Sequence, residues 1–268
     1  MRHTLDLDSY PLDRLKSRCG RAFLESCRQA LENEGMVDLP GFLRAGALAQ
    51  CMAQVGPLFP SAAFRHKRRH NIYFDDRIPG LSPDHPALRQ IETANYTICG
   101  DQIPGSVLSR VYEWPPLAAF LAAALDKTRL FLMDDPLARI NVMAYPAGEG
   151  LNWHFDRSEF TVTLLLQAPA AGGLFQYRTG LRTDDDPNYR GVARLLDGRD
   201  DAVQTRPLTA GTLSLFKGRN TAHRVTPVEG DRYRIVAVFS FYEKPGVRFS
   251  AAERRGFYGR TSVEESLA

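Results

Sequence analysis

Short apolar and β-branched runs, separated by turn residues, fill the second half of the chain and restrict its fold most. Turns such as Pro146-Ala147-Gly148 and Glu229-Gly230-Asp231 divide these runs. Many short strands with frequent turn signals are typical of a β-sandwich or a small barrel. We therefore expect a β core, with strands over 138–144, 160–167, 173–177, 211–216 and 233–242.

The first half of the chain has the spacing of helices. Apolar residues recur every three or four positions over 12–31 and 43–55, and glycine or Gly-Pro follows each run. A third helix is predicted over 114–126, since proline is tolerated in a first helical turn. A short strand is predicted over 36–39, and the proline-rich stretch 59–105 is predicted to be irregular.

The chain has 268 residues, which fits one large domain or two small ones. We expect one unit, in which residues 1–134 form a helical wrapper, 135–250 form the β core and 251–268 form a tail. A polar insertion over 179–207 interrupts the core, with a short helix predicted over 189–196. Long insertions between strands are often lids, and inert decoration is an equal alternative.

Charge and composition exclude several function classes. The chain carries 34 basic and 31 acidic residues, and this net charge of +3 gives no general case for binding nucleic acid. The basic run Phe64–His70 has no interleaved aromatic residues for base stacking, so we interpret it as a solvated face. Hydrophobic residues make up 44% of the chain, as in ordinary globular proteins.

The expected location is the cytoplasm, without membrane contact. The longest apolar run, Leu117–Leu125, is too short to span a bilayer, and the N-terminus lacks the apolar segment of a signal peptide. The four cysteines form no CxxC pair, so we expect reduced thiols. The sequence makes no prediction of the oligomeric state.

His154, Asp156 and His223 have the spacing of a metal site. Residues i and i+2 of an extended chain point to the same face, so His154 and Asp156 can hold one metal ion together. His223 lies at the end of another predicted strand. Each histidine alone would more often be structural. Two histidines and one carboxylate together match the facial triad of non-haem Fe(II) oxygenases.

Two arginines are candidates for binding a carboxylate beside that metal. Arg232 follows the turn 229–231 and is expected to project from the returning strand into the same cavity. A buried guanidinium pairs with a carboxylate through two parallel hydrogen bonds. Arg234 has the same strand parity and is the second candidate.

The motif His154-x-Asp156, His223 and Arg232 resembles the Fe(II)/2-oxoglutarate-dependent oxygenases. This resemblance implies a mainly β fold with α, in which a double-stranded β-helix core of the jelly-roll or cupin-like type is wrapped by N-terminal helices. It implies that His154, Asp156 and His223 hold Fe(II), that Arg232 anchors 2-oxoglutarate, and that Tyr145 contacts this cosubstrate. The enzymes consume O2, and ascorbate is the usual reductant in vitro.

Further motifs look like those of the small bacterial enzymes that halogenate or hydroxylate free amino acids. These motifs are Arg69-His-Asn-Ile-Tyr-Phe, Trp153-His-Phe-Asp, Thr163-Leu-Leu-Leu-Gln and Phe216-Lys-Gly-Arg. In the halogenases of that group a glycine replaces the metal carboxylate, and chloride takes the vacant position. Asp156 leaves no place for a halide. The resemblance thus implies hydroxylation of a free amino acid or a derivative, with 2-oxoglutarate converted to succinate.

Six residues are candidates for contacting the small-molecule substrate: Arg69, His70, Asn71, Arg157, Gln167 and Tyr258. The first three are expected to point a cation or an amide toward a substrate carboxylate. Arg157 stands where lysine-acting relatives have an acidic residue, although strand parity aims it away from the metal unless the chain bends. Gln167 either lines the pocket or caps a strand, and Tyr258 is either an aromatic lid or a packing residue.

Three alternatives remain beside amino-acid hydroxylation. The same oxidant can desaturate a substrate or close a cyclopropane-type ring in natural-product biosynthesis. Tyr145-Pro, Gly172-Gly173 and Asp231-Arg-Tyr look like the prolyl-hydroxylase branch, which suggests a protein hydroxylase. A non-redox metal-binding β-barrel protein is the third alternative, and it would have no need for Arg232.

Overall fold

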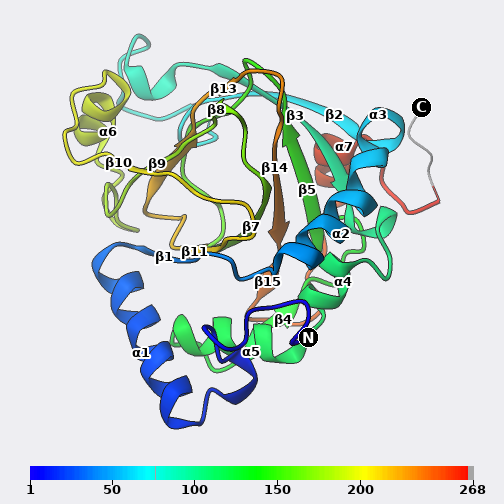
Figure 1. Cartoon of the computed structure of the whole chain (residues 1–268). Coiled ribbons are helices and arrows are strands. Elements are labelled where there is room, and N and C mark those ends of the chain that lie inside the picture. The colour runs from blue at the N-terminus through cyan, green and yellow to red at the C-terminus, as the bar shows by residue number, and fades with distance from the viewer. Residues whose placement is uncertain (76, 265–268) are drawn as a thin grey trace.

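The computed structural model describes residues 1–75 and 77–264, and two antiparallel sheets form its centre (Figure 1). The major sheet has the order β1-β11-β7-β14-β5-β3-β2, and the minor sheet has the order β10-β9-β12-β6. The major-sheet strands are β1 (Met36–Leu39), β2 (Phe64–His70), β3 (Ile91–Cys99), β5 (Ile140–Tyr145), β7 (Thr161–Gln167), β11 (Leu213–Phe216) and β14 (Arg234–Phe239). The minor-sheet strands are β6 (Leu151–His154), β9 (Phe175–Arg178), β10 (Gln204–Arg206) and β12 (Ala222–Val225).

The chain passes repeatedly from one sheet to the other. β5, β7, β11 and β14 lie in the major sheet, and β6, β9, β10 and β12 lie in the minor sheet. Eight strands divided in this way form a double-stranded β-helix, or jelly roll, so the predicted fold class is confirmed. Two short pairs complete the strands: β8 (Ala171–Gly172) with β13 (Val228–Glu229), and β4 (Phe131–Leu132) with β15 (Phe241–Tyr242).

Helices from the first half of the chain cover the outer face of the major sheet (Figure 1). They are α1 (Arg18–Asn33), α2 (Ala45–Val55), α3 (Phe59–Ala62), α4 (Val107–Tyr112) and α5 (Pro115–Ala124). The rings of Phe23 and Phe120 stack at 5.4 Å and join α1 to α5. Short 3₁₀ helices accompany them: η1 (Leu12–Arg14), η2 (Gly56–Leu58), η3 (Pro86–Leu88) and η4 (Gly100–Gln102).

Side chains of the major sheet alternate between this helical layer and the interior of the jelly roll. On β5, Val142 and Ala144 pack under the helices, whereas Met143 and Tyr145 face the interior. Successive residues of a strand point to opposite faces, so one face builds the hydrophobic core and the other lines a cavity.

The stretch 59–105, predicted to be irregular, instead contains β2 and β3, which extend the major sheet beyond β5. The prediction was wrong because the residues of β2 that face the cavity are His66, Arg68 and His70, so no apolar alternation marks the strand. The region 1–134 therefore contributes strands as well as helices.

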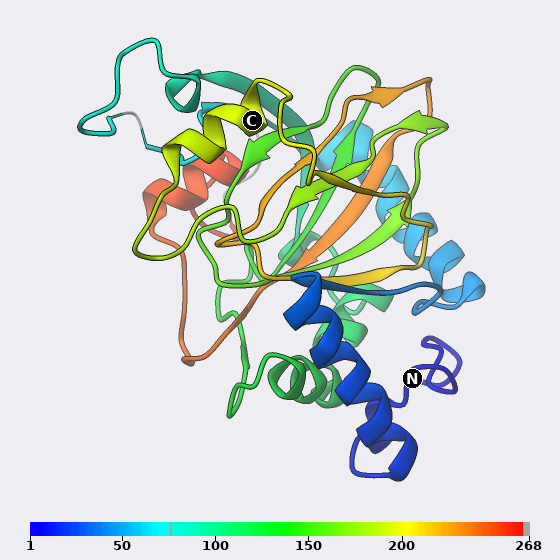
Figure 2. The same ribbon diagram turned by 90° about the vertical axis from the view of Figure 1, so that its left-hand side faces the viewer.

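Two later helices lie away from α1 and α2 (Figure 2). The helix α6 (Tyr189–Leu196) has the predicted bounds and buries Val192 and Leu195 against the minor-sheet side. The helix α7 (Ala251–Tyr258) begins the predicted tail, whose residues 265–268 lie outside the described residues. Among the helices described, none has the length and apolar character needed to span a membrane.

Candidate active site

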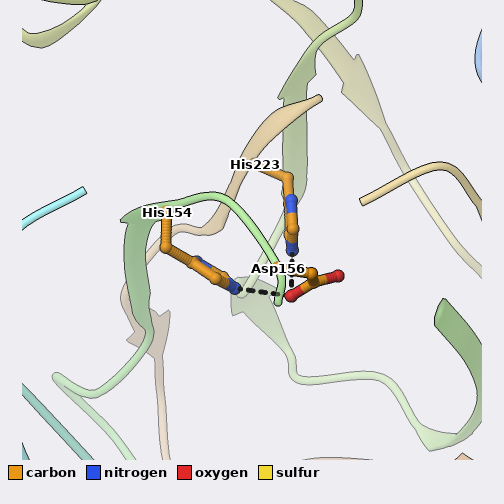
Figure 3. Close-up of side chains that lie close together, drawn as sticks. All are labelled: His154, Asp156 and His223. Atoms are coloured by element: carbon orange, nitrogen blue, oxygen red, sulfur yellow. Dashed lines mark ion pairs between the residues drawn. The ribbon is translucent and has the colours of Figure 1, made fainter. Parts of the chain in front are cut away.

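His154 and His223 lie directly opposite each other on the paired strands β6 and β12. Their ring centroids are 4.1 Å apart, and both side chains are buried. Asp156 follows β6, and its Oδ1 lies 3.4 Å from the Nε2 of each histidine (Figure 3). The sequence motif is thus brought to a single point inside the jelly roll.

Hydrogen bonds fix the tautomer of both histidines. The Nδ1 of His154 lies 2.8 Å from the carbonyl oxygen of Asn152, and the Nδ1 of His223 lies 2.9 Å from that of Thr221. A carbonyl only accepts, so each Nδ1 carries the proton and donates it. Each Nε2 is left with a lone pair facing Asp156, which is the form that binds a metal.

Thr161 and Gly218 hold the carboxylate of Asp156 from its other side. The Thr161 hydroxyl donates to Oδ2 at 2.6 Å, and the Asp156 amide donates to the Gly218 carbonyl at 3.0 Å. A Cβ on residue 218 would lie 2.0 Å from Oδ2, so any larger residue there would have to displace the carboxylate. These contacts occupy Oδ2 and leave Oδ1 pointing toward the histidines.

The electrostatics favour the ionised form of Asp156 and the neutral form of His154, whereas Asp156 raises the pKa of His223 against the effect of burial. Burial alone would raise the pKa of Asp156, but His223 and His154 outweigh it and bring the pKa well below its usual value. Burial, together with His223, lowers the pKa of His154. One ligand atom from each of the three side chains lies within 4.8 Å of the others. Two imidazole nitrogens and one carboxylate oxygen fit a ferrous facial triad.

A cavity of about 680 Å³ opens from the triad between the two sheets. Arg234 lines it and is only 5% exposed, opposite Tyr145 in the β14–β5 register. Burial lowers the pKa of Arg234 and raises that of Tyr145 to about 12. Among the described residues, no carboxylate lies within ion-pairing distance of Arg234. The cavity therefore contains a buried cation that lacks an anionic partner.

Arg232, the first candidate for binding 2-oxoglutarate, is exposed and does not line the cavity. The strand β14 begins at Arg234, so Arg232 still belongs to the preceding turn region. Gln167 donates to the carbonyl of Tyr233 at 2.8 Å and lies outside the cavity. Gln167 lies at the end of β7, so of its two predicted positions it has the one at a strand end.

The structure divides the remaining substrate candidates. His70, Arg157 and Tyr258 line the cavity, whereas Arg69 is exposed on the opposite face of β2. Asn71 does not line it, because its side chain accepts hydrogen bonds from the backbone of the turn after β2. Parity explains the difference for Arg69, since alternate residues of a strand face opposite ways.

Arg157 and Tyr258 lie where the chain closes the cavity. The chain bends after Asp156, and the Arg157 guanidinium lies 3.3 Å from the Glu253 carboxylate of α7. The Tyr258 hydroxyl donates to Oδ1 of Asn141 at 2.9 Å, and the ring is buried. Tyr258 therefore forms a fixed part of the cavity wall.

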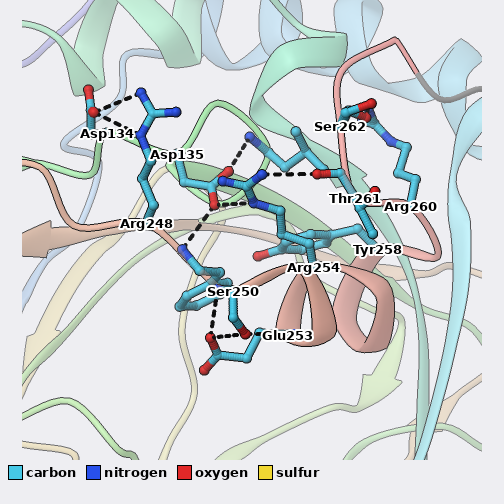
Figure 4. Close-up of polar contacts among 12 residues, drawn as sticks. Asp134, Asp135, Arg248, Ser250, Glu253, Arg254, Tyr258, Arg260, Thr261 and Ser262 are labelled. Atoms are coloured by element: carbon cyan, nitrogen blue, oxygen red, sulfur yellow. Dashed lines mark hydrogen bonds and ion pairs between the residues drawn. The ribbon is translucent and has the colours of Figure 1, made fainter.

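Ionic contacts fasten α7 over the cavity (Figure 4). The carboxylate of Asp135 is fully buried and accepts hydrogen bonds from Arg254 and from the Phe249 amide, at 2.8 and 3.0 Å. Arg260 and Asp101 form a second buried pair through two bonds of 2.7 Å. Arg248 pairs with Asp134 at the surface.

The site residues missed from sequence fall into two groups. Thr161 and Gly218 support Asp156, and Gly218 belongs to the quoted Phe216-Lys-Gly-Arg motif. His66 and Asn95 line the cavity from β2 and β3. Interpreting 64–70 as a strand would have found His66, because it shares the parity of His70.

Comparisons with known proteins agree with this arrangement. A family model described as Halogenase D (HalD) matches residues 20–253. A search of curated proteins finds no match.

Solved structures share the fold at low sequence identity. The non-heme alpha ketoglutarate dependent epimerase SnoN from nogalamycin biosynthesis is 17% identical, with a TM-score of 0.58 over 82% of this chain and 81% of SnoN. The carbocyclase SnoK from the same biosynthesis is 14% identical, with a TM-score of 0.55 over 86% of this chain and 90% of SnoK. An oxidoreductase of the 2OG-Fe(II) oxygenase family from Burkholderia pseudomallei is 14% identical, with a TM-score of 0.52 over 84% of this chain and 92% of that one.

Proposed function

The chain belongs to the Halogenase D family, and from this premise we propose that it is an Fe(II)/2-oxoglutarate-dependent oxygenase that hydroxylates a free amino acid or a close derivative. One observation carries the proposal. His154, Asp156 and His223 converge in one cavity with Arg234, a buried arginine that forms no ion pair with a described carboxylate. A non-redox metal site would explain the triad but not that arginine.

His154, Asp156 and His223 hold the metal in this proposal. When bound, Fe(II) supplies the oxidation chemistry, in which O2 and the decarboxylation of 2-oxoglutarate to succinate drive oxidation of a C–H bond. Backbone carbonyls accept from Nδ1 of both imidazoles, so each Nε2 faces the metal position, and Oδ1 of Asp156 points to the same place. The side of the triad that faces the cavity is left for the cosubstrate and oxygen.

Arg234 and Tyr145 bind 2-oxoglutarate in this proposal. A guanidinium buried without an acidic partner is costly, and a ligand carboxylate would remove that cost. Among the described residues, the Tyr145 hydroxyl has only the sulfur of Met143 as a partner, at 3.7 Å, so it is available to donate to the same carboxylate. Arg232 takes no part.

Asp156 favours hydroxylation over halogenation. In the halogenases that this sequence resembles, a glycine stands at the position of the metal carboxylate, and a halide occupies the vacant site. Here the carboxylate is present and is held by Thr161 and by the wall at Gly218. The proposed product therefore carries a hydroxyl group, although the family is described by halogenation.

Desaturation or ring closure is the second candidate outcome. It would use the same residues, and the fold also occurs in a carbocyclase and an epimerase. A protein hydroxylase fits less well, because α7 covers the cavity and Tyr258 forms part of its wall. A small molecule is therefore the proposed substrate.

The test is incubation of the protein with Fe(II), 2-oxoglutarate, ascorbate, O2 and pools of amino acids. Succinate and product masses are measured in parallel. Substrate-dependent succinate with a product heavier by one oxygen atom supports hydroxylation. A product lighter by two hydrogens supports desaturation or ring closure. The proposal fails if iron-loaded protein forms no succinate above the level of a His223→Ala control in any pool.

A further inference from the structure

His66 and Asn95 form a directly opposed pair on the inner face of β2 and β3. These strands lie outside the eight that make the jelly roll, yet both side chains line the cavity. They are not used to hold the metal, and the proposed 2-oxoglutarate site is complete without them.

Asn95 presents an unused donor to the cavity. Its side chain is 4% exposed, and its Oδ1 accepts a hydrogen bond from the Thr97 hydroxyl at 2.7 Å. With Oδ1 accepting from Thr97, Nδ2 is the amide atom left for the cavity. No described residue accepts a hydrogen bond from Nδ2. Nδ2 therefore has a hydrogen bond to offer, and a ligand oxygen in the cavity would accept it.

His66 lies opposite Asn95 and is covered by Phe257 of the helix α7. Its ring stacks on Phe257 with the centroids 5.8 Å apart and the planes at 20°. Burial lowers the pKa of His66, and Arg68 and His70 lower it further, so the ring is neutral and keeps one N–H donor. No described residue forms a hydrogen bond with either ring nitrogen.

The side chains that this wall presents to the cavity are basic or neutral. Arg68 is the next residue on the same face of β2, and its guanidinium lies 4.7 Å from the centre of the Phe74 ring. The acidic residues that line the cavity have their own partners. Glu253 pairs with Arg157, and both Glu159 and Glu243 pair with Lys127.

We propose that Asn95 and His66 bind the carboxylate of the substrate, with Phe257 packing over it. The inference rests on the proposed function and adds the recognition of one substrate group. It assigns Arg234 and Tyr145 to one carboxylate and the Asn95–His66 pair to another. The substrate class is an organic acid, such as an amino acid with a free α-carboxylate, and not its amide.

The test measures binding directly, so it does not depend on turnover. Calorimetry compares L-amino acids with the matching carboxamides on the full-length protein, loaded with Ni(II) and 2-oxoglutarate, and also without them. We expect the wild type to bind acids in preference to amides. Asn95→Asp and His66→Phe each remove a donor, while His66→Phe keeps the stack on Phe257. Each should weaken acid binding about tenfold or more.

Two controls separate recognition from folding and from cosubstrate binding. Asn33→Asp makes the same chemical change at an exposed position of α1 and should leave acid binding unchanged. The affinity for 2-oxoglutarate should stay the same in Asn95→Asp. If that variant loses 2-oxoglutarate instead of the amino acid, the pair belongs to the cosubstrate site and the inference is overturned.

The remaining outcomes also decide the matter. If no amino acid binds the wild type in either state, or if amides bind as well as acids, the carboxylate assignment is overturned. If acids bind in an Asn95-dependent way but no succinate forms in the activity assay, the recognition site stands and the proposed oxygenase function fails. If succinate forms but amino-acid binding is unchanged in both variants, the proposed oxygenase function stands and the recognition site is overturned.

Discussion

At the scale of single residues, Gly218 decides where the carboxylate of Asp156 can lie. A methyl group at this position would come within 2.0 Å of Oδ2. We predict that Gly218→Ala displaces the carboxylate and lowers the affinity for Fe(II) about tenfold to a hundredfold, as for other residues that orient metal ligands. Metal titration of the variant measures this, with Gly46→Ala, an open helical position, as the control. Equal metal affinity in the two variants would show that Asp156 does not need this wall.

Arg234 and Arg232 offer a matched pair, two residues apart, of which one is buried and one is exposed. We predict that Arg234→Gln raises the KM for 2-oxoglutarate about tenfold or more, because hydrogen bonds to a charged group are lost. Arg232→Gln should leave the KM near the wild-type value. Succinate assays at varied 2-oxoglutarate concentration distinguish the two, and a larger effect at Arg232 would contradict the assignment.

The predictive power of the sequence differs among these residues. His154, Asp156 and His223 could be found because the metal requires defined ligand types on neighbouring strands. Arg234 was only the second candidate, because Arg232 has the same parity and the sequence does not reveal where β14 begins. Gly218 stood in a quoted motif, but its role depends on a contact with Asp156 across the fold.

At the scale of elements, α7 depends on the buried carboxylate of Asp135. This side chain is fully buried and bonds to Arg254 and to two backbone amides. We predict that Asp135→Ala lowers the free energy of unfolding by about 3–5 kcal/mol, because it removes the carboxylate partner of a largely buried arginine and the acceptor of two amides. Urea denaturation measures this change, and hydrogen exchange should rise first in α7.

Arg248→Ala is the control for that prediction, because the Arg248–Asp134 pair is more than half exposed on both sides. Exposed pairs contribute little, so its effect should stay within about 1 kcal/mol. An equal decrease in the free energy of unfolding in the two variants would show that the burial of Asp135 is not what holds α7 in place.

The elements themselves were predicted unevenly. The helix α6 was found with its observed bounds because Val192 and Leu195 give it one apolar face. The strands β2 and β3 were missed because the side chains that they turn toward the cavity, such as His66 and Asn95, are polar. Amphipathic alternation reports burial against apolar neighbours, so it fails for a strand that faces a binding site.

At the scale of the whole molecule, metal binding should stabilise the fold, because His154 and His223 converge only when β6 pairs with β12. With Ni(II) present at about 100 times its Kd, linkage gives about 2.7 kcal/mol, which corresponds to a Tm increase of about 5–10 °C in a chain of this size. Thermal denaturation with Ni(II) and with a chelator tests this. The increase should vanish in His223→Ala, and a Tm that does not respond to the metal in the wild type would argue against a site formed by folding.

The alternation along the major sheet has a consequence for how this chain tolerates change. On β14, Ile235 and Ala237 pack under the helices, while Arg234 and Val236 line the cavity. In a saturation mutagenesis experiment scored once for cellular abundance and once for product, substitutions at the first set should lower both scores together. Substitutions at the second set should lower product more than abundance. The difference between the abundance score and the product score would then alternate from one residue of the strand to the next. Neighbouring codons of one strand would therefore come under different selection.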